Sequence, residues 1–209
     1  MFAWILGLLF GLAAIPLAIA LPHTFSAAHG APFATMFGMG AAGGAVLTVL
    51  IMRKAPMLAV LEHEMTHLLV ALLHLRLPES LNAGKEGGEV TYSGNSAFLI
   101  RLAPYVLPTF TLMLLGASPF VAPAHQNALR ALIGVTWGYH VTTALYETRP
   151  AQPDLQAGVR VPALLAVAGL GLLLYTGSAL WAVRDFGLCR EWVVEAGHAA
   201  LRLANLARA

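Results

Sequence analysis

Long apolar runs free of Lys, Arg, Asp and Glu limit what this chain can fold into. Residues 2–21, 33–52 and 161–183 contain no charged side chain. A helix needs about 20 apolar residues to cross the hydrocarbon core of a bilayer. Charged residues make up only 11% of the chain, against roughly 25% in an ordinary soluble domain. The sequence therefore predicts an integral membrane protein.

The complete pattern predicts an all-α, polytopic bundle of about six transmembrane helices. The predicted spans are 2–21, 33–52, 57–77, 97–115, 127–146 and 161–183. Residues 1–183 would form the transmembrane domain, and 184–209 a C-terminal amphipathic helix at the membrane interface or a frayed tail. The first run lacks the basic segment of a signal peptide, so we expect a retained span rather than a cleaved leader.

Glycine and proline positions predict local features of these spans. The Gly40-x-x-x-Gly44 spacing lets a second helix approach closely. Pro104 and Pro108 are expected to kink the run 97–115. Residues 87–94 are polar and glycine-rich and predict a short strand between turns.

Charge and cysteine content exclude some classes of protein. The formal charge of +2 is small and dispersed, which argues against a nucleic-acid partner. Cys189 is the single cysteine, so the chain has neither an internal disulfide nor a cysteine-based zinc site. The Arg53-Lys54 pair in a short loop favours a cytoplasmic N-terminus in a cell membrane of bacterial or archaeal type.

The predicted span 57–77 contains the segment His63-Glu64-Met65-Thr66-His67. Histidines four residues apart project from one face of a helix and can bind the same metal ion. Ionisable groups inside a membrane span are costly, so such a cluster indicates a function. The spacing is typical of zinc metalloproteases, in which the glutamate acts as general base on a water. It predicts zinc bound by His63 and His67, with Glu64 as the base.

With these residues the chain resembles the site-2 protease family of intramembrane zinc metalloproteases. The resemblance covers roughly residues 57–165 and rests on the histidine motif, the glycine-rich segment 87–94 and a later Asp in Gln152-Pro153-Asp154-Leu155. It implies cleavage of transmembrane substrates inside the bilayer and makes Asp154 the third zinc ligand. The family usually has Asn-Pro-Asp-Gly around this Asp, from which the present chain departs.

The residues themselves leave the third ligand open. A catalytic zinc has three protein ligands and one open position, and His140, Glu147, His74 and Glu62 are further candidates. If 97–115 and 127–146 both cross the membrane fully, Asp154 faces the side opposite the start of span 57–77. Either one of these runs is then re-entrant, or the segment 150–162 dips inward to reach the metal.

We therefore expect a zinc-dependent endopeptidase that hydrolyses a peptide bond of a transmembrane protein or peptide within the lipid bilayer. The edge of the strand 87–94 either pairs with an extended substrate or belongs to an ordinary surface hairpin. A non-catalytic membrane scaffold with the same fold is one alternative, and a metal-ion transporter is another. A transporter would spread its acids and histidines over several spans, whereas here they cluster in one.

Overall fold

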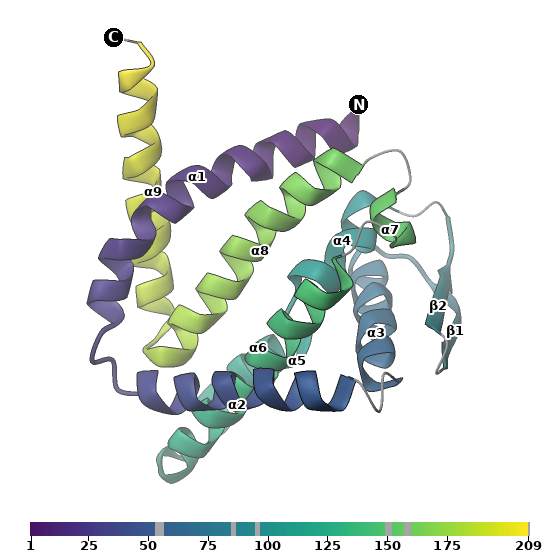
Figure 1. Cartoon of the computed structure of the whole chain (residues 1–209), viewed down its shortest axis with the longest axis horizontal. Helices are drawn as coiled ribbons and strands as arrows, with labels where there is room; N and C mark the ends of the chain where they lie inside the picture. The colour runs from purple at the N-terminus through teal and green to yellow at the C-terminus, as the bar shows by residue number, and fades with distance from the viewer. Residues whose placement is uncertain (53–56, 85–86, 95–96, 149–151, 157–159, 209) are drawn as a thin grey trace.

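The computed structural model describes residues 1–52, 57–84, 87–94, 97–148, 152–156 and 160–208. Within these residues most of the chain is helical, and one two-stranded sheet lies at the edge of the helices (Figure 1). In chain order the elements are α1 (Phe2–Ala28), α2 (Ala34–Met52), α3 (Met57–Leu73), β1 (Pro78–Gly84), β2 (Gly87–Tyr92), α4 (Phe98–Val106), α5 (Thr109–Ala117), η1 (Ser118–Phe120), η2 (Pro123–His125), α6 (Gln126–Glu147), α7 (Pro153–Gln156), α8 (Arg160–Val183) and α9 (Phe186–Leu206).

Two helices, α1 and α8, are long and apolar enough to cross a membrane. A third candidate is the broken pair formed by α4 and the segment Thr109–Phe120, which bends by 73°. The described residues therefore support two spans, or three if the bent pair is one span, and the prediction of about six is met only in part. Helix α2 is apolar but shorter, and ionisable side chains lower the hydropathy of α3 and α6.

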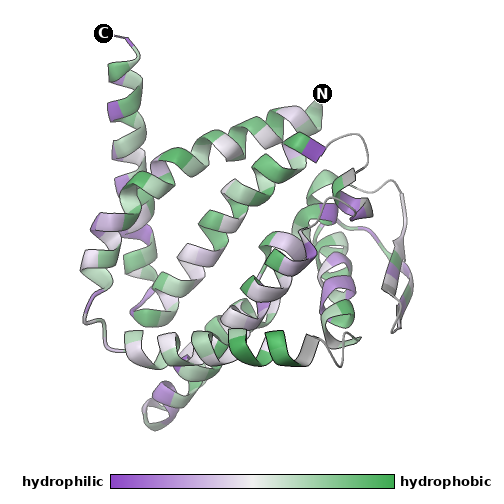
Figure 2. Cartoon of the chain, viewed as in Figure 1, coloured by the Kyte–Doolittle hydropathy of each residue, from purple (hydrophilic) through white to green (hydrophobic). Residues whose placement is uncertain are grey.

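The exposed surface of α1 is strongly apolar along the length of the helix. Phe2, Ile5, Leu9 and Leu12 are each more than half exposed, and the hydrophobic colour of Figure 2 runs along α1, α2 and α8. Contiguous apolar surface of this kind is energetically costly when it is exposed to water. The same surface is readily accommodated by the hydrocarbon core of a bilayer. The fold is thus compatible with a membrane protein.

Glycines bring α2 and α6 into direct backbone contact. A Cβ on Gly40 or Gly44 would overlap the backbone of Ala131 or Val135. The matching glycines of α6, Gly134 and Gly138, face the backbone of α2 in the same way. The close approach predicted from the Gly40-x-x-x-Gly44 spacing is therefore present, and α6 provides a second set of glycines at the same spacing.

A break between α4 and α5 interrupts the predicted span 97–115. Leu107 has extended backbone angles (φ −100°, ψ 102°), as expected before a proline, because the ring of Pro108 disfavours the helical region for the preceding residue. The predicted kink in this run is confirmed, and the 73° bend falls at Pro108 rather than at Pro104, which lies inside α4.

The strand predicted near residues 87–94 is one arm of a hairpin. Strands β1 and β2 pair antiparallel, with Leu81 opposite Val90, and a register irregularity lies near Pro78. Both strands pack beside α3. The sequence indicated β2 but not its partner, because Pro78–Gly84 lacks the alternation of apolar and polar residues that marks a strand.

The C-terminal segment is a helix rather than a frayed tail. Asp185 caps α9 by accepting a hydrogen bond from the backbone N–H of Leu188 at 3.0 Å. The indole of Trp192 is fully buried and donates to the carbonyl of Leu17 at 3.1 Å, which holds α9 against α1. The last turns of α9 extend past α1 (Figure 1). A location at the membrane interface stays a prediction.

Candidate metal centre

Helix α3 places the two motif histidines on one face, as the i, i+4 spacing predicts. The Nε2 atoms of His63 and His67 lie 3.2 Å apart, and the two rings meet edge to face with centroids 4.8 Å apart. Both side chains are about nine-tenths buried. Two imidazole nitrogens therefore converge on one point beside α3.

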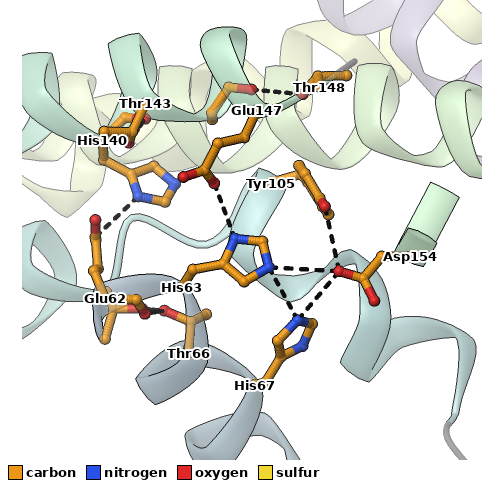
Figure 3. Close-up of polar contacts among 12 residues, drawn as sticks. Glu62, His63, Thr66, His67, Tyr105, His140, Thr143, Glu147, Thr148 and Asp154 are labelled. Carbon is orange, nitrogen blue, oxygen red and sulfur yellow. Dashed lines mark hydrogen bonds and ion pairs between the residues drawn. The ribbon is translucent and has the colours of Figure 1, made fainter. Parts of the chain in front are cut away.

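Asp154 supplies a third group at the same point. It lies on the short helix α7, and its Oδ2 atom is 3.4 Å from Nε2 of His63 and 3.4 Å from Nε2 of His67. Figure 3 shows the carboxylate facing the two rings. Among the described residues, His63, His67 and Asp154 form a group that could hold a metal ion.

The spacing of the three atoms fits a tetrahedral ion. Imidazole nitrogens and carboxylate oxygens bind zinc at about 2.0–2.2 Å, which requires ligand atoms about 3.3 Å apart in a tetrahedral site. The observed separations of 3.2, 3.4 and 3.4 Å form a nearly equilateral triangle of this size. Three ligands on one triangular face would leave the fourth position of such an ion open.

The opposite nitrogens of both rings are occupied by hydrogen-bond acceptors. Nδ1 of His63 donates to Oε2 of Glu147 at 2.9 Å, and Nδ1 of His67 donates to the backbone oxygen of Ile100 at 2.8 Å. Since each Nδ1 carries the proton, each Nε2 has a free lone pair directed at the common point. This arrangement of acceptor, imidazole and metal-binding nitrogen is typical of histidine ligands.

Glu64 is buried beside the two histidines and faces the hairpin. An added Cβ on Gly88 of β2 would lie 2.5 Å from Cγ of Glu64 and 2.8 Å from its Oε1. Glu64 is also close enough to His63, His67 and Asp154 to interact with their charges. We call His63, His67 and Asp154 the metal group. The carboxylate of Glu64 thus lies next to the metal group without being part of it, as expected for a base rather than a ligand.

Tyr105 of α4 packs beside the metal group and contacts both His63 and Asp154. Its ring meets the ring of His63 edge to face with centroids 5.4 Å apart. Its hydroxyl donates to Oδ2 of Asp154 at 3.3 Å. The side chain is almost completely buried, so a phenolic hydroxyl is fixed close to the metal group.

The other candidate ligands lie elsewhere. His140 is buried in α6, where its Nδ1 lies 3.1 Å from Oε1 of Glu62, and the two residues link α6 to the back of α3 (Figure 3). Glu147 contacts the far nitrogen of His63 rather than the metal side. His74 is exposed and donates to the carbonyl of Val70. The structure thus brings Asp154, and none of these four, to the two Nε2 atoms.

Sequence reasoning missed three contributors to this site. Tyr105 belongs to no motif, the glycine-rich segment 87–94 predicted a strand but not the contact of Gly88 with Glu64, and the backbone carbonyl of Ile100 has no side-chain signature. A signal for Ile100 did exist, because Pro104 has no N–H to donate to the carbonyl four residues earlier. Glu147 was considered only as a ligand, although it lies seven residues after His140, near the same face of α6.

Comparison with known proteins assigns neither a family nor a function to this chain. No protein-family model, no curated protein and no solved structure matches the chain. The resemblance to site-2 proteases therefore rests on the residues quoted above and stays a prediction.

Proposed function

We propose that this chain is an intramembrane zinc endopeptidase, similar to site-2 proteases, that hydrolyses a peptide bond of a membrane-embedded protein or peptide. The observation that carries the proposal is the triangle formed by His63, His67 and Asp154, with Glu64 beside it. Two imidazoles, one carboxylate and an open fourth position are the ligand set of a catalytic rather than a structural zinc site.

The residues of the site have separate roles in the proposed hydrolysis. His63, His67 and Asp154 would hold the zinc, which would supply polarisation of a carbonyl oxygen and a water that is nucleophilic near neutral pH. Glu64 takes a proton from the attacking water and can pass it to the nitrogen of the departing amine. Glu147 and the carbonyl of Ile100 hold the two rings in the tautomer that binds a metal.

The apolar outer surface of the fold suits a substrate that comes from the membrane. The site lies on α3, packed against α4, while the exposed surfaces of α1 and α2 are apolar. Asp154 is the most exposed of the three ligand residues, with 27% of its side chain accessible, which provides a route for water. A transporter would need several groups along a path, whereas the described residues contain one such group.

The test combines metal content with cleavage of a synthetic membrane-spanning peptide by the purified full chain. We expect about one zinc ion per chain, the number that one three-ligand site holds, and cleavage that stops when a chelator removes the metal. Glu64→Gln should keep the zinc and lose turnover, because the amide cannot accept the proton. Glu191→Gln, an exposed position on α9, serves as the matched control and should behave as the wild type.

Two outcomes would contradict the proposal. A zinc-loaded wild-type protein that leaves every membrane-spanning peptide intact would favour the non-catalytic scaffold. Cleavage by Glu64→Gln at the wild-type rate would show that hydrolysis does not depend on this base.

A further inference from the structure

The hydroxyl of Tyr105 lies among the groups of the proposed reaction, although hydrolysis as described above does not use it. It is 3.3 Å from Oδ2 of Asp154, the same oxygen that faces both histidines at 3.4 Å. Figure 3 shows Tyr105 beside His63, with its hydroxyl directed at the carboxylate of Asp154. A substrate carbonyl that reaches the open position beside the triangle would therefore come close to this hydroxyl.

The ring of Tyr105 is held so that only the hydroxyl hydrogen is free to turn. The side chain is 1% exposed and packs edge to face on His63. Its own backbone carbonyl accepts a hydrogen bond from the hydroxyl of Tyr175 on α8. Rotation about the bond from the ring to the oxygen redirects the donor without moving the ring, so the donor is preorganised.

The hydrogen bond from Tyr105 to Asp154 is weak enough to be exchanged. An O–H···O bond normally spans 2.5–3.0 Å, and a charged acceptor usually shortens it further, yet this bond spans 3.3 Å. A cation bound by Asp154 would withdraw electron density from the carboxylate and make it a poorer acceptor. The hydroxyl then loses little by turning to a more negative oxygen nearby.

We propose that Tyr105 is a catalytic residue that donates a hydrogen bond to the oxyanion of the tetrahedral intermediate. When water adds to the scissile carbonyl, the new C–O bond forms, the π electron pair moves to the carbonyl oxygen, and the water proton passes to Glu64. Tyr105 stabilises the negative oxygen and keeps its own proton. Collapse of the intermediate restores the carbonyl and breaks the C–N bond, and the proton held by Glu64 passes to the departing nitrogen. This inference rests on the proposed function.

The experiment compares Tyr105→Phe with the wild type at saturating zinc. The substitution keeps the ring and removes only the donor, so we expect unchanged zinc content, unchanged KM and a kcat lower by about 10²-fold, as for other oxyanion donors. Affinity for a peptide phosphonate, which mimics the tetrahedral oxyanion, should fall by a similar factor. Affinity for the uncleaved peptide, measured in the Glu64→Gln background, should stay the same. Tyr139→Phe on α6, a half-buried tyrosine outside the metal group, controls for the loss of a hydroxyl.

The outcomes separate this inference from the proposed function. If the wild type cleaves the peptide and Tyr105→Phe matches it at saturating zinc, Tyr105 only positions Asp154 and the inference is wrong while the protease proposal stands. The same conclusion follows if excess zinc restores the activity of the variant, or if the phosphonate binds both proteins equally. If the zinc-loaded wild type cleaves nothing, the proposed function fails and the inference fails with it.

Discussion

The Nδ1 atom of His67 lies 2.8 Å from the backbone oxygen of Ile100, the carbonyl that would normally accept a hydrogen bond from residue 104 of the same helix. Residue 104 is proline and has no N–H. The carbonyl of Ile100 is thereby left available inside α4, and the imidazole of His67 takes the vacant position. A proline inside one helix thus helps to orient a histidine on another.

Pro104→Ala should therefore weaken metal binding. The new N–H competes for the Ile100 carbonyl and draws it back into the helix, so we expect the apparent zinc affinity to fall by up to roughly tenfold, the lower end for changes beside a ligand. Competition with a chromophoric chelator measures this. Pro16→Ala, inside α1, is the matched control, and equal affinities in both variants would show that the proline is not needed.

Glu147 holds the other histidine, and its removal should have a larger effect. Glu147→Ala leaves Nδ1 of His63 without its acceptor at 2.9 Å, so we expect zinc affinity to fall by 10–100-fold. Glu147→Gln keeps an acceptor oxygen and should lie between Ala and the wild type. The same chelator competition ranks the three proteins. Identical affinities for all three would mean that Glu147 does not orient His63.

The third ligand can be tested by comparing Asp154 with His140. Asp154→Ala removes one corner of the triangle and should lose zinc as severely as His67→Ala. His140→Ala should keep the metal and lose at most 10–100-fold in activity, because His140 contacts Glu62 rather than the ligand atoms. Elemental analysis of the purified variants decides between them. Zinc retained in Asp154→Ala but lost in His140→Ala would reverse the assignment.

Gly88→Ala should lower turnover without loss of metal. The added methyl would meet Cγ of Glu64 at 2.5 Å and Cγ1 of Val60 at 2.8 Å, so either the carboxylate or the hairpin must shift. Misplacement of a catalytic group by about 1 Å can cost about 10²-fold, and we expect a decrease of tenfold to 10²-fold at wild-type zinc content. Gly116→Ala, where the methyl meets open space, should remain fully active. A fully active Gly88→Ala protein would mean that Glu64 tolerates the displacement.

Gly44→Ala tests the packing of α2 on α6. The methyl would overlap the backbone of Val135, so the helices must separate, at a cost of about 1–3 kcal/mol. The adjacent Gly43→Ala points into open space and should be neutral or slightly stabilising, because alanine favours helix. Thermal unfolding in detergent compares the two proteins, and equal midpoints would argue against close backbone contact as a source of stability.

The sequence alone determined the features that depend on neighbours in the chain. The apolar runs predicted a helical membrane protein, the Gly40-x-x-x-Gly44 spacing predicted a close helix contact, and the proline before α5 predicted a break. The spacing of His63 and His67 predicted that both rings share a face of α3. These features follow from the 3.6-residue period of the helix and the fixed chemistry of glycine and proline, which act over a few residues.

Only the tertiary structure decided which distant residues meet these histidines. Glu147 and Asp154 follow His63 by 84 and 91 residues. The resemblance to site-2 proteases pointed to Asp154 as the third ligand, but the helical period did not distinguish Asp154 from Glu147, and nothing in the sequence predicted the hydrogen bond of Glu147 to His63. The packing of α4, α6 and α7 around α3 places Asp154 at Nε2 and Glu147 at Nδ1 of one ring. Because that choice depends on how helices pack and not on the order of residues within any one of them, periodicity carries no information about it.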